Sequence, residues 1–290
     1  MEHVMSGFLN AFSDFMASRE HDMHRVAEFR LGGESACIQL SPALPCQNIY
    51  SVAKVFTVAA VGLLFDSGLL STDDTVTEAL GNLCPDRFHP LWKDTTVHML
   101  LRHQVGLPES FMDIDSEDAH TFGTDYLSYV MNHELRPDHG TKYTYTDASH
   151  YILSCIVENR SGMSLDNLLW REMFYPMAFR DAAWSHCPGG HAIGSTGLYL
   201  RIEDMIKMGG LYLQGGVWDG QRLLSEKWVE TVVERQYEFL PVGTDGAYGK
   251  GGMLGQMLLV IPQHRRAVAW QAAGGLGQEN AMEFACMYDA

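Results

Sequence analysis

Ser51-Val52-Ala53-Lys54 opens the stretch of sequence that decides the fold, because a run of almost entirely apolar residues follows it as far as Leu64. A helix that is apolar on every side lies buried in the middle of a domain rather than at its surface. Positions i and i+3 of a helix share a face, so we expect the Lys54 amine beside the Ser51 hydroxyl. The stretch therefore predicts a central helix that begins with a serine nucleophile and a lysine that helps to deprotonate it.

A Ser-x-x-Lys match also has a simpler interpretation, in which Ser51 caps the helix and the Lys54 side chain reaches solvent. A lysine within a buried helix, however, needs a charged partner or a catalytic task to offset its desolvation. The choice between the two interpretations depends on whether further motifs accompany the pair.

The composition is typical of a globular protein, since 46% of the 290 residues are hydrophobic and 19% are charged. The 20 basic and 36 acidic residues give a formal net charge of −16, which argues against a nucleic-acid partner. No apolar run is long enough to cross a bilayer, and Met1-Glu2-His3-Val4 does not open a secretion signal. We therefore expect a cytoplasmic protein without a membrane partner, whose six scattered cysteines are reduced thiols.

Hydrophobic alternation predicts strands near both ends of the chain. Val26–Leu31 and Ala36–Leu40 alternate around Gly32-Gly33, and Met257–Ile261 and Ala267–Trp270 flank a second turn, so each pair predicts a β-hairpin. Helical periodicity and end signals predict helices at residues 5–16, 52–64, 97–103, 126–134, 149–159 and 165–174.

This order of elements predicts an α/β fold of the α+β type. Its antiparallel sheet is built from both chain ends and flanked by helices, and a mainly helical subdomain is inserted between the two parts of the sheet. We expect a single domain over residues 1–290, in which residues 1–65 and 180–290 contain the sheet and residues 66–179 are mainly helical.

Two further stretches supply groups that a Ser-Lys acyl-transfer site needs. Tyr143-Thr144-Tyr145-Thr146-Asp147 opens a predicted helix and offers a phenol that acts as a base when cationic neighbours stabilise the phenolate. Tyr248–Gln256 contains Lys250-Gly251-Gly252, which places a second lysine on a glycine-rich edge strand that a substrate backbone can approach.

These three motifs resemble, in order and spacing, the Ser-x-x-Lys, Tyr-x-Asn and Lys/His-Thr/Ser-Gly motifs of the serine β-lactamase and penicillin-binding-protein superfamily. The similarity is to its class C β-lactamase, D,D-peptidase and esterase branch, and it runs from about Ile49 to Trp270. Connecting segments are similar as well, namely Leu63–Asp74, Leu100–Pro108 and Gly197–Leu224. The resemblance implies a β-lactamase/transpeptidase-like fold with a last helix on the sheet, for which Glu279–Asp289 is the candidate.

The resemblance also implies a role for each motif residue. Ser51 is the expected nucleophile, Tyr145 with Lys54 takes its proton, and Lys250 adds a positive charge beside the phenol. The backbone N–H groups of Ser51 and Met253 are expected to form the oxyanion hole. Expected substrate-binding residues are Gln104, Asp147, Gly251, Gly252 and Met253. No metal or organic cofactor is required, the expected partner is a small ester or amide substrate, and the oligomeric state stays open.

Two positions depart from the family pattern. Asp147 replaces the usual asparagine, and a carboxylate there should hold Lys54 protonated, which makes Tyr145 the base. Gly251 replaces the threonine or serine whose hydroxyl helps to bind the substrate carboxylate in β-lactamases. Either carboxylate recognition is weakened, or the glycine is required by a positive φ angle. We therefore expect a serine hydrolase that acts through an acyl-enzyme on small esters or amides.

Other functions stay open at this stage. The same motifs allow a β-lactamase, a D-Ala-D-Ala carboxypeptidase, a D-aminopeptidase, or a catalytically weak homologue that only binds a ligand. A metal hydrolase is disfavoured because the pairs His98/His103, His133/His139 and His186/His191 lack His-x-x-x-His spacing. An α/β-hydrolase is excluded because no Gly-x-Ser-x-Gly elbow exists.

Overall fold

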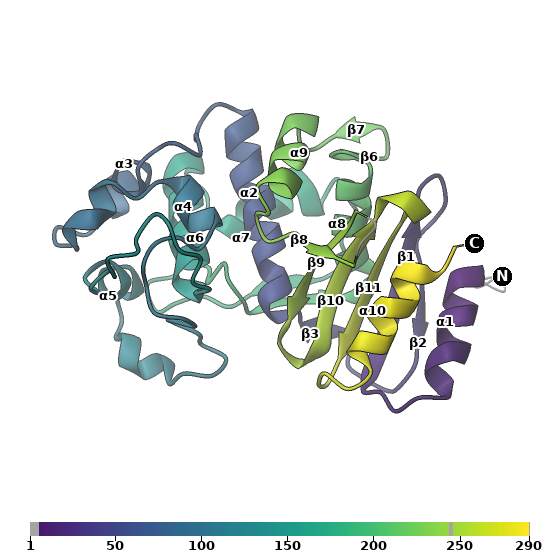
Figure 1. Cartoon of the computed structure of the whole chain (residues 1–290). Helices are drawn as coiled ribbons and strands as arrows, with labels where there is room; N and C mark the ends of the chain where they lie inside the picture. The colour runs from purple at the N-terminus through teal and green to yellow at the C-terminus, as the bar shows by residue number, and fades with distance from the viewer. Residues whose placement is uncertain (1–5, 244–245, 290) are drawn as a thin grey trace. The chain divides into compact units, whose positions relative to one another are not determined.

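The computed structural model describes residues 6–243 and 246–289 and divides the chain into two compact units (Figure 1). The first unit consists of Met1–Val52, Met177–Ala182 and Leu198–Ala290, and the second of Ala53–Pro176 and Ala183–Gly197. Met5, which the helical periodicity predicts on the first helix, lies outside the described residues.

The first unit is organised by a six-stranded antiparallel sheet with the strand order β2-β1-β11-β10-β9-β8. Its strands are β1 (Met23–Arg30), β2 (Ala36–Gln39), β8 (Leu240–Val242), β9 (Ala247–Gly252), β10 (Gln256–Ile261) and β11 (Arg266–Ala272). Both predicted hairpins are confirmed, since β1 pairs with β2 and β10 pairs with β11. The sheet is assembled from both ends of the chain because β1 lies directly against β11.

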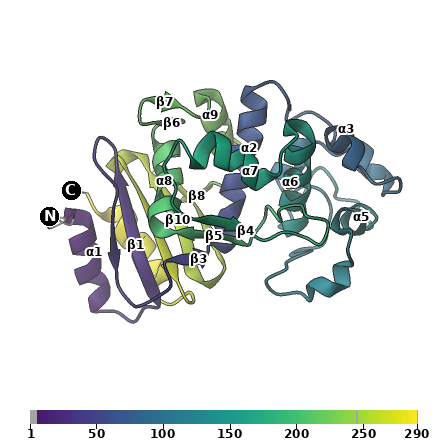
Figure 2. The ribbon, with the colours of Figure 1, turned by 180° about the vertical axis from the view of Figure 1, so that it is seen from behind.

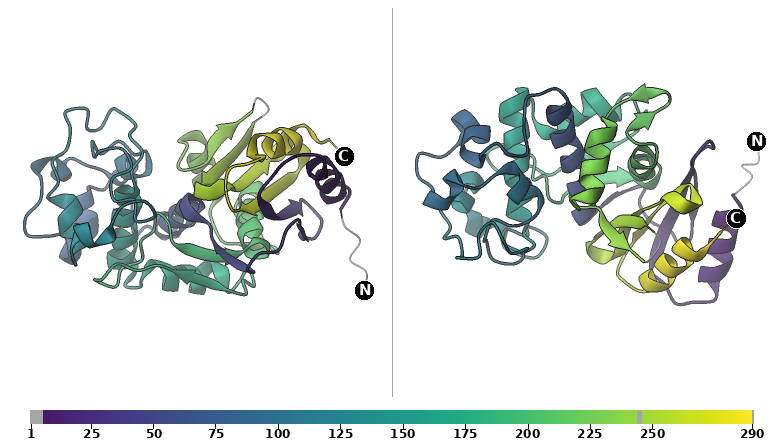
Figure 3. Two further views of the ribbon diagram at one scale, coloured as in Figure 1. Left: turned by 90° about the horizontal axis from the view of Figure 1, so that it is seen from below. Right: turned by 45° about the horizontal axis from the view of Figure 1, so that its top comes forward.

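Helices cover both faces of this sheet. The helices α1 (Gly7–Ala17) and α10 (Gln278–Met287) lie side by side, as Figure 3 shows. The apolar side of α1 joins α10 and the inward residues of the strands in one core, which explains its amphipathic sequence. The predicted last helix at Glu279–Asp289 is confirmed as α10. The helix α8 (Ile202–Leu213) packs on β1, β10 and β11 from the opposite face (Figure 2).

The remaining elements of the first unit are short. The strand β3 (Cys46–Asn48) pairs with β5 (Leu198–Arg201), and β6 (Val217–Trp218) forms a hairpin with β7 (Gln221–Arg222). The helix α9 (Glu226–Glu234) precedes β8, and the 3-10 turn η1 (Tyr50–Val52) follows β3. The strand β4 (Ala182–Trp184) begins in the first unit and ends in the second.

The second unit is mainly helical. Its helices are α2 (Ala53–Asp66), α3 (Val76–Leu80), α4 (Val97–Leu101), α5 (Tyr126–Met131), α6 (Asp147–Ser161) and α7 (Leu165–Leu169), which a π-helical turn (Trp170–Phe174) extends. The helix α2 is buried over most of its length, as its apolar sequence predicts, and it packs on α6 and α7. Among the described residues, no helix has the length and apolar character needed to cross a membrane.

The boundaries of the two units differ from the expected subdomain limits. Residues 53–65 were expected with the sheet, but α2 belongs to the helical unit because its apolar surface is buried against α6 and α7. Residues 183–197 also belong to the helical unit, where their backbone carbonyls accept hydrogen bonds from α2 and α6.

Candidate active site

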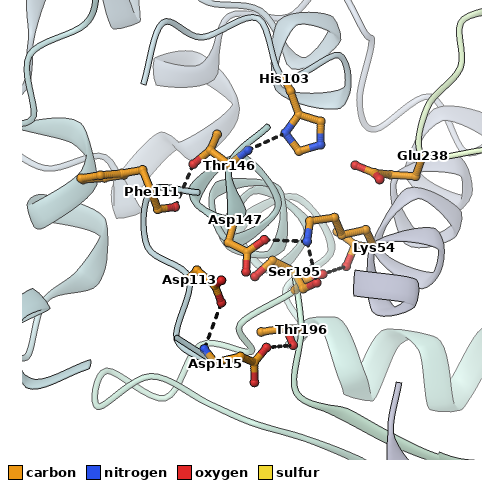
Figure 4. A network of polar contacts seen from close by, with 12 residues as sticks. Lys54, His103, Phe111, Asp113, Asp115, Thr146, Asp147, Ser195, Thr196 and Glu238 are labelled. Carbon is orange, nitrogen blue, oxygen red and sulfur yellow. Dashed lines mark hydrogen bonds and ion pairs between the residues drawn. The ribbon is translucent and has the colours of Figure 1, made fainter. Parts of the chain in front are cut away.

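Lys54 is completely buried in α2, and its Nζ contacts a carboxylate and a backbone oxygen (Figure 4). It donates to Asp147 Oδ1 at 2.6 Å and to the backbone oxygen of Ser195 at 2.9 Å. A buried ammonium group is stable only when such partners replace its water shell. The interpretation in which Lys54 reaches solvent is therefore wrong, and the expected charged partner is Asp147.

Asp147 is the first residue of α6, where the positive end of the helix dipole also favours a carboxylate. The preceding residue, Thr146, fixes the start of the helix through two hydrogen bonds. Its backbone N–H donates to His103 Nδ1 at 3.3 Å, and its hydroxyl donates to the backbone oxygen of Phe111 at 2.8 Å. These contacts hold the Asp147 carboxylate in a position to pair with Lys54.

Tyr145 completes the group of motif residues in the helical unit. Lys54 Nζ lies 4.8 Å from the centroid of the Tyr145 ring, within the range of a cation–π contact. The His103 ring packs beside Tyr145, with 4.8 Å between the two ring centroids. The structure therefore brings Lys54, Tyr145 and Asp147 together, although the second motif is far from the first in sequence.

The segment from Gly194 to Thr196 also contacts this group, and sequence reasoning missed it. Thr57 of α2 donates to the Gly194 oxygen at 2.6 Å, next to the contact between Lys54 and Ser195. Gly194 has a φ angle of +73°, and a Cβ there would lie 2.4 Å from the backbone oxygen of His150. Only glycine fits such a position, so the run Gly194-Ser195-Thr196-Gly197 was the available sequence signal.

Asp115 is a second carboxylate of the helical unit that sequence reasoning missed. It accepts a hydrogen bond from the Thr196 hydroxyl, and its electrostatic neighbours include Asp147 and Lys54. Partial burial raises the pKa of Asp115, and the hydrogen bond from Thr196 offsets part of that rise. Asp115 is thus a second carboxylate, besides Asp147, that interacts electrostatically with Lys54.

Ser51 lies in the first unit, in the turn η1 that leads directly into α2 three residues before Lys54. The end of strand β9 passes close to this turn. A Cβ added to Gly252 would lie 2.6 Å from the Ile49 oxygen and 3.3 Å from the Ser51 nitrogen. The glycine is therefore required by the close approach of two backbones.

Lys250 is buried on β9, where it forms an ion pair with Glu238. Glu238 belongs to no family motif, and no sequence pattern identified it as a site residue. The expected open edge of β9 needs a correction, because β8 pairs with β9 over Ala247–Gly249. Lys250, Gly251 and Gly252 lie beyond the last of these pairs.

Gly251 does not have a positive φ angle, which excludes the explanation that backbone strain requires a glycine there. A Cβ at this position would meet only the Met257 methyl group at 3.5 Å and the Gln256 oxygen at 3.9 Å, which is ordinary contact. The backbone thus accepts a larger residue at position 251. The missing hydroxyl is a chemical difference from the family pattern.

The two remaining predicted residues lie at the ends of elements. Met253 follows Gly252 at the start of a 3-10 turn and is 40% exposed. Gln104 lies after α4 in the helical unit, where its side chain donates to the Thr141 oxygen at 3.4 Å. The predicted residues thus form two groups, with Lys54, Gln104, Tyr145 and Asp147 in the helical unit and Ser51, Lys250, Gly251, Gly252 and Met253 in the sheet unit. Their action on one substrate stays a prediction.

The chain is similar in sequence to a known hydrolase. The 6-aminohexanoate-dimer hydrolase of Paenarthrobacter ureafaciens is 27% identical over 202 residues, which are 64% of this chain and 50% of that protein. The chain therefore spans about half the length of this curated relative.

Solved structures show the same fold. A penicillin-binding protein homologue from Caulobacter crescentus aligns with a TM-score of 0.74 and 16% identity, over 97% of this chain and 96% of that one. A D-stereospecific amidohydrolase from a Streptomyces species aligns with a TM-score of 0.70 and 15% identity, over 97% of this chain and 99% of that one.

A family profile described as Beta-lactamase matches residues 46–282, a range that includes Ser51, Lys54, Tyr145 and Lys250. The match covers most of the chain, and the relatives named above are hydrolases or penicillin-binding-protein homologues. The chain belongs to the beta-lactamase family.

Proposed function

We propose that this protein is a serine hydrolase that cleaves small esters or amides through an acyl-enzyme. The observation that carries the proposal is the buried contact between Lys54 and Asp147, 2.6 Å long and beside the Tyr145 ring. A family member that had lost catalysis would have no evident need for a buried ammonium group three residues after a serine. The names of the relatives, a dimer hydrolase and an amidohydrolase, support hydrolysis of an amide.

In the proposed first step, Ser51 Oγ attacks the carbonyl carbon of the substrate while Tyr145 accepts the hydroxyl proton. Lys54 stays an ammonium group because Asp147 pairs with it, and its charge stabilises the phenolate form of Tyr145. The backbone N–H groups of Ser51 and Met253 stabilise the oxyanion. The tetrahedral intermediate collapses, the leaving group takes the proton from Tyr145, and Ser51 keeps the acyl group as an ester.

In the second step, water attacks the Ser51 ester while Tyr145 takes a proton from the water. Collapse of the second intermediate releases the carboxylic acid, and the proton returns to Ser51 Oγ. The sequence of steps uses side chains, backbone N–H groups and water. These steps do not define which acyl group and leaving group the substrate carries, because the residues that surround the site select them.

Covalent labelling tests the proposal. A fluorophosphonate probe should label the wild-type protein, and mass spectrometry should place the adduct on Ser51. The Ser51→Ala variant should lose both the label and the hydrolysis of p-nitrophenyl esters, whereas Ser67→Ala, an exposed serine of the same chain, should keep both. Equal turnover by the wild type and Ser51→Ala would refute the mechanism, and binding without an adduct would indicate a ligand-binding homologue.

A further inference from the structure

Lys250 already has an anionic partner within the chain. The side chains of Lys250 and Glu238 are 7% and 3% exposed, and they form a direct ion pair. The surrounding protein keeps such a buried ion pair together, because bulk water does not reach either group to replace its partner. The charge of Lys250 is therefore neutralised before any substrate arrives.

The pair lies on the side of β9 that faces the nucleophile. Successive residues of a strand point to opposite faces, so Lys250 and Gly252 point to the same face. The direction of a Cβ at Gly252 leads to the Ser51 nitrogen, 3.3 Å away. Lys250 and its partner Glu238 thus lie on the face of the strand that Ser51 adjoins.

The backbone holds Glu238 in place. It lies two residues before Leu240, which pairs with Gly249 of β9, so the antiparallel direction of β8 brings Glu238 beside the end of β9. Its φ angle of +67° is uncommon for a residue with a side chain, and its N–H donates to the Gln236 oxygen at 3.0 Å. The flanking Tyr237 and Phe239 are buried. A strained backbone between buried aromatic residues persists only where its surroundings fix it.

We infer that Glu238 is a specificity-determining residue, which makes the site select acyl donors without a negative charge at the end near Lys250. This inference rests on the proposed function of Ser51. A substrate carboxylate that approached Lys250 would meet the carboxylate of Glu238 and would have to displace it. Gly251 offers no hydroxyl to compensate. Uncharged or amine-bearing acyl groups avoid this repulsion, and an amine gains attraction from Glu238.

Two esters that differ in one charge test the inference. 4-Nitrophenyl hexanoate and 4-nitrophenyl hydrogen adipate have the same acyl length, and only the second carries a terminal carboxylate. The wild type should hydrolyse the hexanoate with a kcat/KM at least tenfold higher. In Glu238→Gln, the ratio of adipate to hexanoate kcat/KM should rise at least tenfold, because Lys250 becomes available to the carboxylate.

Glu234→Gln is the matched control, since it removes the same charge from an exposed position at the end of α9. Its ratio should equal that of the wild type. Glu238→Asp retains the charge and should keep most of the discrimination, which separates the effect of charge from that of disturbed packing. Both Glu238 variants are compared with the wild type by thermal unfolding before their kinetics are measured.

The possible results distinguish a failure of the role given to Glu238 from a failure of the proposed function. A wild type that prefers the adipate ester, or hydrolyses both equally, overturns the inference without the need for any variant. An unchanged ratio in a folded Glu238→Gln protein that reacts with the fluorophosphonate also overturns it and leaves the proposed function standing. Absence of both labelling and ester hydrolysis in the wild type overturns the proposed function, and the inference falls with it.

Discussion

Lys54 and Asp147 form a buried ion pair, 2.6 Å from Nζ to Oδ1, between residues that are 93 positions apart in the sequence. The pair joins the first turn of the apolar helix α2 to the first turn of α6. A carboxylate at this point, in place of the asparagine of the family pattern, keeps a positive charge beside Tyr145 without leaving that charge unpaired.

The first prediction concerns the energetic coupling of this pair. Lys54→Met should lower the free energy of unfolding by about 3–5 kcal/mol, because the Asp147 carboxylate is left buried without its cation. Combining it with Asp147→Asn should recover part of that loss. Urea unfolding of both single variants and the double variant should give a coupling energy on the order of 1–3 kcal/mol.

The pair of Lys142 and Asp138, 3.7 Å apart, provides the control for that cycle, since Lys142 is exposed and Asp138 is only half-buried. Lys142→Met and Asp138→Asn should give a coupling energy below about 1 kcal/mol, because solvent screens the interaction. Coupling at Lys54 and Asp147 no larger than at this surface pair would contradict the assigned importance of the buried contact.

The second prediction concerns Tyr145 as the base. Tyr145→Phe keeps the ring that packs beside Lys54 and His103 but removes the hydroxyl. The rate of ester hydrolysis should fall by a factor on the order of 10²–10⁴, the usual contribution of a general base. The thermal unfolding temperature of the variant should stay close to that of the wild type. Hydrolysis within a few-fold of the wild-type rate would remove Tyr145 from the mechanism.

The third prediction concerns the approach of β9 to the nucleophile. Gly252→Ala should lower kcat/KM by roughly 10²-fold, because a Cβ must push the Ile49 oxygen and the Ser51 nitrogen out of place. Gly251→Ala is the matched neighbour, where a Cβ makes ordinary contacts and should cause a far smaller loss. Equal losses in the two variants would show that the Ser51 turn does not depend on this approach.

The fourth prediction concerns the missing hydroxyl at position 251. Gly251→Thr should fold, since Gly251 has no positive φ angle and its Cβ would meet only ordinary contacts. Acylation by benzylpenicillin should increase relative to hydrolysis of a neutral ester, because only the penicillin carries a carboxylate for the new hydroxyl to bind. Stopped-flow acylation and steady-state ester hydrolysis are measured on the same preparation. A gain confined to the neutral ester would contradict this role for the hydroxyl.

The sequence by itself determined the elements and the family resemblance. Apolar residues on every side of Val52–Leu64 predicted a buried helix, and alternation predicted the strands that pair as β1 with β2 and β10 with β11. These signals are local, because each follows from the burial of a repeating set of side chains. The three motifs could likewise be recognised from their spacing.

Only the tertiary structure decided which groups interact across long stretches of chain. It paired Lys250 with Glu238, and it placed the Ser195 oxygen within hydrogen-bond distance of the Lys54 amine. The family resemblance by itself predicts Asp147 beside Lys54, and the structure supplied the contact itself. Glu238 carries no local signal, since its role arises from a turn with a positive φ angle and from the register of β8 on β9. Pairing of buried charges depends on where separate segments meet after folding, and the spacing of residues within one segment does not encode that geometry.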